Sequence, residues 1–283
     1  MRLVVLYKHG VTMGTPPTNP NRNPVKRGEV KGWTKAATRR NTNFLRSVDD
    51  MAIMATEDGE PLTALALTHT LKDCPPSHKH WQDILEAFFQ RLRRMGLYRH
   101  HWITEWQRRG VPHLHACVFF PEVTGTDYIK LNNAILNAWL ELTAQYGAKP
   151  LSQNITPVYD AVGWFQYQSK HAARGIYHYQ RSSENIPEEW KKTGRMWGKS
   201  KLWPVTDPEK VLVNDSVYFR YRRICRSWRK ADARTPINRF RIRSARRMLK
   251  HNDKDKSKLR GVSEWITKDI SSLALKTVMA MYS

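Results

Sequence analysis

The 283-residue sequence predicts an α+β fold in which helices cover one face of an antiparallel sheet. Three patterns predict it: short apolar runs of strand length, two long segments with helical apolar spacing, and a turn containing glycine and proline between two neighbouring strands. Along the chain the order is strand, helix, strand, strand, helix, strand, and then a further helix. This β-α-β-β-α-β order is typical of the ferredoxin-like (split βαβ) arrangement, which leaves the other face of the sheet open.

Each element has its own signal. The apolar run at 62–71 has strand length, and the next helix begins after Pro75 and Pro76, keeps its apolar residues three and four apart from Trp81 to Met95, and ends at Gly96. The remaining elements are expected as strands at Arg99–Gln107, His113–Phe120 and 153–158, and as helices at 127–146 and 160–174. Upstream, helical spacing runs from Trp33 to Val48, whereas residues 11–31, rich in Pro, Asn, Thr and Gly, are expected to form a loop.

Charge is the strongest compositional signal. The chain holds 48 Lys and Arg against 25 Asp and Glu, a net charge of +23. Such a surface binds polyanions, and nucleic acid is the first candidate because neutralising phosphates releases condensed counterions. We expect no membrane anchoring, because no stretch approaches 18 apolar residues. The N-terminus is too short and too quickly polar for a secretory signal, and the three cysteines are far apart, so a reducing cytoplasm is expected.

The positive charge is concentrated near the C-terminus. Residues 220–260 hold 17 Lys and Arg against three Asp, which is +14 of the net +23. We therefore interpret residues 205–283 as a basic, mainly helical DNA-binding region. Its candidate contacts are Arg222, Arg223, Arg226, Arg229 and Lys230. The alternative is a solvated surface of small helices without a defined site.

A His-Leu-His sequence lies inside one of the expected strands. Because side chains alternate along a strand, His113 and His115 share a face and can bind one metal ion. If the five-residue loop 108–112 closes the hairpin, Gln107 faces His113 and Glu105 faces His115, so Glu105 joins them. Two histidines and a carboxylate leave positions open for substrate oxygens on Mg²⁺ or Mn²⁺. The alternative is a pair of histidines that form hydrogen bonds within the sheet. A one-residue change of register would turn Glu105 to the other face.

A similar pair, His78 and His80, lies just before a helix without strand context, and we interpret it as a helix entry.

A polar stripe is predicted on the helix at 160–174. Residues three and four apart share a helix face, which groups Tyr167, Lys170, His171 and Arg174. A tyrosine hydroxyl can attack a phosphodiester and store the bond as phosphotyrosine, while a nearby lysine favours the phenolate or neutralises the phosphate. By composition alone, the neighbouring tyrosines at 159, 177 and 179 are equally eligible.

The segments EWQRRGVPHLHACVFF and, some fifty residues later, YQSKHAARG resemble the HUH endonucleases. More narrowly, they resemble the rolling-circle replication initiators of filamentous and other small bacteriophages and plasmids. TALALTHTL resembles the first motif of that family, and TGRMWGKSKLWP resembles the segment after its tyrosine motif. The resemblance covers about residues 33–204, and its second and third motifs are specific in combination.

The resemblance implies roles for particular residues. His113 and His115 would bind the divalent metal, with Glu105 as the third ligand. Tyr167 would cut one strand and keep the 5′ phosphate, which leaves a 3′ hydroxyl that primes synthesis by a host polymerase. Some relatives carry a second tyrosine four residues later, where this chain has His171, so a two-tyrosine cycle is not expected. Arg108, Arg109 and Arg174 are further candidates for DNA binding.

These expectations divide the chain into three parts: an N-terminal accessory segment at 1–60, an endonuclease domain at 61–204 and the basic region at 205–283. No helicase is fused to it, so a host helicase is expected to open the duplex in the bacterial cytoplasm. Two alternatives stay open. One is a transposase or relaxase with the same site, and the other is a non-catalytic basic DNA-binding protein.

Overall fold

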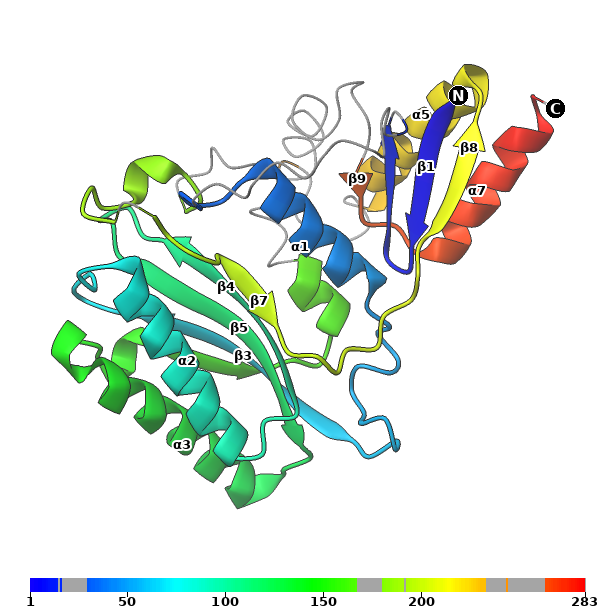
Figure 1. Cartoon of the computed structure of the whole chain (residues 1–283). Coiled ribbons are helices and arrows are strands. Elements are labelled where there is room, and N and C mark those ends of the chain that lie inside the picture. Colours follow the sequence, from blue (N-terminus) through cyan, green and yellow to red (C-terminus); the bar gives the residue numbers. More distant parts are fainter. Residues whose placement is uncertain are drawn as a thin grey trace.

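A computed structural model describes residues 1–14, 16, 30–166, 180–190, 192–232, 243 and 263–282. Within this part of the chain the fold is α+β, as predicted, with two antiparallel sheets and helices packed on both (Figure 1). We call them the five-stranded sheet and, because it joins the two ends of the chain, the terminal sheet. No helix in the described ranges has the length and apolarity needed to cross a lipid bilayer.

The five-stranded sheet contains the elements that the sequence predicts. Its strands are β3 (Leu62–Thr70), β4 (Arg99–Trp106), β5 (Pro112–Pro121), β6 (Asn154–Pro157) and β7 (Trp197–Lys199). They lie in the order β6-β3-β5-β4-β7, and every neighbouring pair is antiparallel. The strand β7, which pairs with the edge of β4, was not expected from the sequence.

Two helices cover one face of this sheet, α2 (His78–Arg94) and α3 (Gly125–Thr143) (Figure 1). The Ser77 side chain accepts a hydrogen bond from the His80 N–H and caps α2, and Gly96 follows the helix with φ of 94°. The apolar side of α2 packs with Trp139 of α3 and with the β-strand residues of the same face into the largest core cluster. Short 3₁₀ turns at Ala144–Tyr146 and Pro150–Ser152 lead from α3 into β6, and a third lies at Ser183–Asn185.

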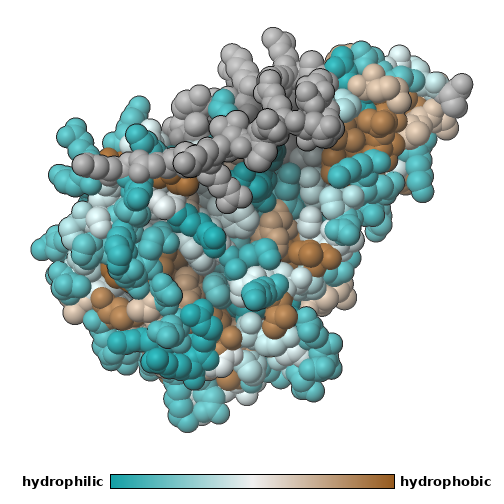
Figure 2. All heavy atoms as spheres, in the orientation of Figure 1, coloured by the Kyte–Doolittle hydropathy of each residue, from teal (hydrophilic) through white to brown (hydrophobic). Residues whose placement is uncertain are grey.

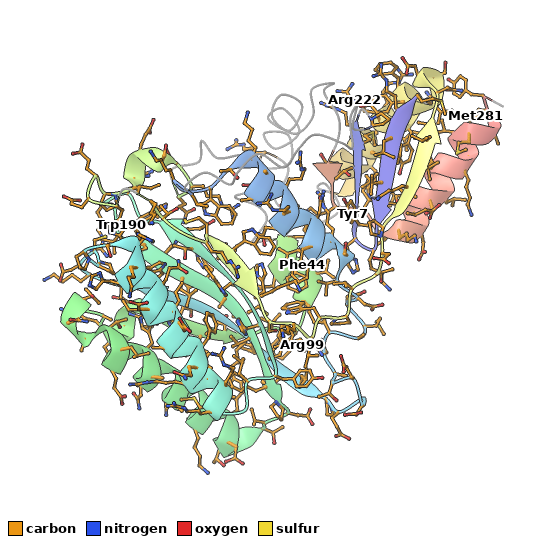
Figure 3. The ribbon with its side chains drawn as sticks, viewed as in Figure 1. Tyr7, Phe44, Arg99, Trp190, Arg222 and Met281 are labelled. Atoms are coloured by element: carbon orange, nitrogen blue, oxygen red, sulfur yellow. The ribbon has the colours of Figure 1, made fainter. Side chains whose placement is uncertain are left out.

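The opposite face is not open, which corrects the expectation of helices on one face alone. The helix α1 (Lys35–Ser47) and the helical residues 161–166 lie over it (Figure 1). Leu45 and Phe165 pack there with Phe119 in a second core cluster. Phe44 lies between α1 and the sheet, with its ring 5.9 Å from His101 (Figure 3). The outward-facing apolar side chains of the strands must be covered, and these two helices cover them.

The terminal sheet has the strand order β8-β1-β2-β9. Its strands are β1 (Arg2–Tyr7), β2 (Gly10–Gly14), β8 (Glu209–Val213) and β9 (Ser263–Glu264), and its helices are α5 (Asp215–Asp232) and α7 (Lys268–Ala280). Part of the segment expected as a loop at 11–31 is therefore strand. The ends expected as separate regions, 1–60 and 205–283, share this sheet, and the second of them contains strands as well as helices. Both ends bury their apolar residues in one core, which explains the pairing.

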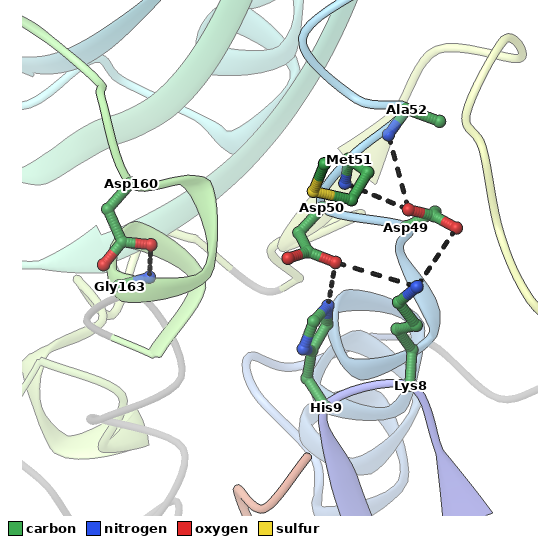
Figure 4. A network of polar contacts seen from close by, with 8 residues as sticks. All are labelled: Lys8, His9, Asp49, Asp50, Met51, Ala52, Asp160 and Gly163. Atoms are coloured by element: carbon green, nitrogen blue, oxygen red, sulfur yellow. Dashed lines mark hydrogen bonds and ion pairs between the residues drawn. The ribbon is translucent and has the colours of Figure 1, made fainter. Parts of the chain in front are cut away.

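Polar contacts join the turn between β1 and β2 to the segment that follows α1. The Lys8 Nζ lies 3.4 Å from an Asp49 carboxylate oxygen, and the His9 Nε2 lies 3.1 Å from Asp50 (Figure 4). The His9 N–H also donates to the Arg46 carbonyl at 3.0 Å. Apolar surface gathers on the terminal sheet and its helices (Figure 2), where Leu212, Leu273 and Met281 are exposed.

Candidate metal centre

The β4–β5 hairpin brings the predicted metal ligands to one face. Glu105 pairs with His113 and Ile103 pairs with His115. The predicted register, with Glu105 opposite His115, was wrong by two residues. The Gln107 N–H donates to the Val111 carbonyl at 2.9 Å and closes a shorter loop, whose Gly110 has φ of 77°. Because side chains alternate with a period of two, this shift leaves Glu105 on the histidine face.

Glu105, His113 and His115 form what we call the ligand cluster. One ligand atom from each lies within 4.8 Å of the others, and all three residues are buried. Glu105 Oε2 lies 3.5 Å from His115 Nε2, and the two imidazole rings are 4.5 Å apart. Within the described part of the chain, Glu105 Oε2, His113 Nε2 and His115 Nε2 have no hydrogen-bond partner. Buried polar atoms without partners are costly, and a shared cation would satisfy all three. The cluster therefore fits a divalent metal ion.

Burial keeps both histidines neutral. Burial, followed by the neighbouring His115, lowers the pKa of His113 to about 3, and Glu105 opposes the shift. The pKa of His115 falls to about 4, mainly through burial and then through the positive charge of Arg181. A neutral imidazole offers a lone pair to a metal, so both side chains are in the ligand form at neutral pH.

Two further residues hold the ligands in place. The Thr68 hydroxyl lies 2.9 Å from His115 Nδ1 and occupies the ring nitrogen that points away from the cluster. The Arg181 Nε donates to Glu105 Oε1 at 2.9 Å and leaves Oε2 directed toward the histidines. Such second partners fix the orientation of metal ligands. Neither Thr68 nor Arg181 was predicted from the sequence as a site residue. Alternation along 62–71 could have found Thr68, which pairs with His115. Arg181 has no such signal, because it lies outside the strands.

Other predicted site residues have different surroundings. Arg109 lies in the hairpin loop, where its guanidinium donates to the carbonyls of Leu71 and Lys72 and to the Gln107 side chain. Its contacts here are within the protein. Arg108 is exposed in the same loop.

The predicted catalytic stripe lies outside the described residues. Tyr167, Lys170, His171 and Arg174 fall outside the described residues, as do Tyr177 and Tyr179. Tyr159, the remaining alternative, is 90% exposed. The described residues before the gap end in the helical stretch 161–166, where Asp160 Oδ1 accepts the Gly163 N–H at 2.8 Å (Figure 4).

The basic residues predicted near the C-terminus lie on α5. Arg222 (Figure 3) and Arg226 are half-buried, and Arg223 is exposed. Arg229 and Lys230 belong to the same helix, but their side chains are not among those that the structure describes. The second histidine pair, His78 and His80, begins α2, as the helix-entry interpretation predicts.

Comparisons with known proteins place this basic protein among replication proteins. The model of the replication-associated protein ORF2 family matches residues 64–206, the segment that contains the ligand cluster. The replication-associated protein of Pseudomonas phage Pf3 is 46% identical over 94% of this chain and 93% of its own length. Two Xylella fastidiosa proteins, named as putative replication proteins, are 46% identical (strain 9a5c; 95% of this chain, 94% of theirs) and 43% identical (strain Temecula1; 94% and 99%). No solved structure matches the chain.

The chain belongs to this replication-associated protein family. The resemblance to replication initiators of bacteriophages and plasmids is thereby confirmed.

Proposed function

We propose that this protein is a metal-dependent, site-specific endonuclease and strand transferase of the HUH type that acts on single-stranded DNA. It would initiate rolling-circle replication of a phage or plasmid through a 5′-phosphotyrosine intermediate. The observation that carries the proposal is the ligand cluster, in which three buried atoms of Glu105, His113 and His115 converge without hydrogen-bond partners among the described residues.

The strand order supports an HUH-type sheet. The helix α2 connects β3 to β4, and β5 lies between these two strands in the order β6-β3-β5-β4. Inserting an antiparallel strand into a βαβ unit in this way is the defining feature of the split βαβ arrangement. It places the central strand β5, with both histidines, in the middle of the sheet, where the backbone is held from both sides.

The chemistry proposed for this site is a balanced transesterification. The Tyr167 hydroxyl oxygen attacks the scissile phosphorus, the P–O3′ bond breaks, and the departing 3′ oxygen takes a proton to become a 3′ hydroxyl. Mg²⁺ or Mn²⁺ bound by the ligand cluster would supply Lewis-acid polarisation of the phosphodiester. Lys170 would neutralise the phosphate charge. The phosphotyrosine conserves the energy of the broken bond, so a later 3′ hydroxyl can reseal the strand.

The positive surface would hold the DNA. With a net charge of +23, binding is expected to come mainly from phosphate contacts. In addition to origin DNA, the proposal implies a host helicase, which opens the duplex, and a host polymerase, which extends the 3′ hydroxyl. The reaction would take place in the cytoplasm of a bacterial host.

Two other functions explain the same observations less completely. A transposase or relaxase could share the site, but the family and the phage Pf3 relative favour replication. A non-catalytic DNA-binding protein would have no need for three buried ligand atoms without partners among the described residues, since each is costly to bury.

The test is a covalent-adduct assay. Protein is incubated with labelled single-stranded origin DNA and Mn²⁺, and we expect a denaturation-resistant protein–DNA adduct. Peptide mapping should place the nucleotide on Tyr167. Tyr167→Phe should bind the DNA like the wild type and form no adduct, because the substitution removes only the attacking oxygen.

The matched control is Tyr159→Phe, which alters an exposed tyrosine nearby and should form the adduct normally. An adduct on another tyrosine would keep the enzyme class and overturn the assignment of Tyr167. No adduct with metal-loaded protein on several candidate origins would favour the non-catalytic alternative.

A further inference from the structure

A buried arginine neutralises the charge of the ligand cluster. The Arg181 side chain is fully buried, and its Nε donates to Glu105 Oε1 at 2.9 Å. The Trp33 ring covers the guanidinium at 4.1 Å, and the Trp33 Nε1 donates to the Thr104 carbonyl at 2.8 Å. The contacts of Arg181 thus include a carboxylate oxygen and an aromatic face, beside the residues that would bind a metal.

The position of Arg181 is also set through the backbone. The carbonyl of the preceding residue, Gln180, accepts the Trp106 N–H at 2.8 Å, at the end of β4 next to Glu105. The guanidinium therefore approaches Glu105 from the edge of β4. An arginine is positively charged at every physiological pH, so this charge is a permanent part of the site.

Among the described residues, the Arg181 charge offsets that of the Glu105 carboxylate. Glu105 contributes one negative charge and Arg181 one positive charge, with the Arg181 Nε 2.9 Å from Glu105 Oε1. A dication entering this site meets an attractive carboxylate and a repulsive guanidinium a few ångströms apart, with little water to screen either. Without DNA, the site therefore attracts a divalent ion far less strongly than the Glu105 carboxylate would attract it if Arg181 were absent.

A DNA phosphate supplies the charge that the site lacks. Two histidines and one carboxylate oxygen leave several positions on a Mg²⁺ or Mn²⁺ ion for other oxygens, and a phosphodiester brings one negative charge to them. The same phosphate is attracted by Arg181 itself.

We propose that Arg181 weakens the metal site so that it fills when single-stranded DNA contributes its own phosphate oxygen. The protein without DNA would then remain largely metal-free, and loading would occur on the substrate. This inference rests on the proposed metal site and names a role for Arg181 that the proposed reaction does not require.

The test measures Mn²⁺ binding directly, by titration calorimetry and by the electron paramagnetic resonance signal of free Mn²⁺. In wild-type protein, Mn²⁺ affinity should rise at least tenfold when a single-stranded oligonucleotide is added. By linkage, Mn²⁺ should tighten oligonucleotide binding by the same factor. Equal Mn²⁺ affinity with and without the oligonucleotide would overturn the proposal, and this arm needs no variant.

Two variants isolate the charge of Arg181. Arg181→Gln removes the charge but keeps an N–H donor for Glu105, and its Mn²⁺ affinity without DNA should rise at least tenfold. Arg181→Lys is the matched control, because it keeps the charge, and its affinity should stay near the wild-type value. Folding is checked by circular dichroism. Folded Arg181→Gln protein that binds Mn²⁺ no more tightly than the wild type would reduce Arg181 to a positioning residue and overturn the proposal.

The outcome separates this inference from the proposed function. Mn²⁺ binding that survives in the double variant His113→Ala/His115→Ala would refute the ligand cluster itself. If Mn²⁺ binding requires both histidines but is unchanged by Arg181→Gln and by DNA, only the proposed role of Arg181 is refuted.

Discussion

The two sheets of this protein differ in how much chain separates their paired strands. In the five-stranded sheet, the hairpin that carries the ligand cluster closes between Gln107 and Val111. In the terminal sheet, β1 pairs Arg2 with Val213. The short connection brings the candidate metal ligands together through local geometry, whereas the terminal sheet depends on both ends of the chain meeting in one core.

The sheets also differ in what they bury. The five-stranded sheet encloses polar groups, including Glu105, His113 and the ion pair of Glu105 with Arg181. The core of the terminal sheet is mainly apolar, and the sequence of its helix α5 holds six basic residues against Asp215 and Asp232. From this comparison we propose that catalysis and DNA affinity are separable: catalysis would belong to the five-stranded sheet, and a large part of the DNA affinity to α5.

The strongest test of this separation removes the metal ligands. The double variant His113→Ala/His115→Ala should form no covalent adduct, because two of the three ligand atoms are missing. Its DNA affinity, measured without added metal, should stay close to the wild-type value, since the basic surface is unchanged. An adduct assay and a binding titration on the same preparation measure both. Chelation by EDTA should mimic the variant, and undiminished nicking in EDTA would refute a metal-dependent reaction.

A smaller effect is expected from the second partner of His115. Thr68→Val removes the hydroxyl 2.9 Å from His115 Nδ1 and should weaken Mn²⁺ binding by about 10- to 100-fold. Calorimetric titration of Mn²⁺ in the presence of a single-stranded oligonucleotide measures it. Thr63→Val is the matched control, because Thr63 lies on the same strand and bonds to the Val123 backbone instead. Equal Mn²⁺ affinity in the two variants would show that the Thr68 hydroxyl does not orient the ligand.

On the terminal sheet, the matching test changes charge on α5. Arg220→Gln/Arg223→Gln removes two exposed charges and should reduce DNA affinity, because fewer phosphates are neutralised. The log–log salt slope should fall by about 0.7–0.9 for each phosphate that the helix no longer neutralises. Adduct formation at saturating DNA should not change. Binding titrations from low to moderate salt measure the slope.

The control removes two positive charges from the helices of the five-stranded sheet instead. Lys79→Gln/Lys130→Gln alters two exposed lysines of α2 and α3 and should leave the slope nearly unchanged. An equal fall in both double variants would mean that α5 has no special role. Deleting residues 205–283 is a poorer test, because it also removes the partners of β1 and β2.

The smallest effect is a pH dependence of stability that arises from the five-stranded sheet. Burial lowers the pKa of His69 to about 3, and its ring stacks 4.9 Å from Trp139. Unfolding returns the pKa to its ordinary value near 6.5, so below that pH the unfolded state binds more protons. Stability should therefore fall as the pH drops from about 6.5 toward 3, by up to about 1.4 kcal/mol per pH unit from this residue.

Urea unfolding at several pH values measures this slope. His69→Phe should reduce it, whereas His80→Gln, at an exposed position in the first turn of α2, should not. Equal slopes in the wild type and His69→Phe would refute the contribution of His69.

Local sequence patterns were sufficient to predict much of the candidate metal site. Alternation in β5 placed His113 and His115 on one face, and the hairpin turn added Glu105 even though the register was wrong by two residues. The error was harmless because a two-residue slip preserves the face of every side chain. The apolar spacing from Trp81 to Met95 likewise predicted α2, because a helix repeats its buried face every three to four residues.

The sequence by itself determined the order of the main elements in the five-stranded sheet, the pair of histidines and the basic character of α5, since each depends on neighbours a few residues apart. Only the tertiary structure decided that β1 and β2 join β8 and β9, that α1 covers the histidine face of the sheet, and that Arg181 pairs with Glu105. These contacts join segments far apart in the chain. Their partners are selected by the burial of complementary surfaces, which no local pattern in either segment records.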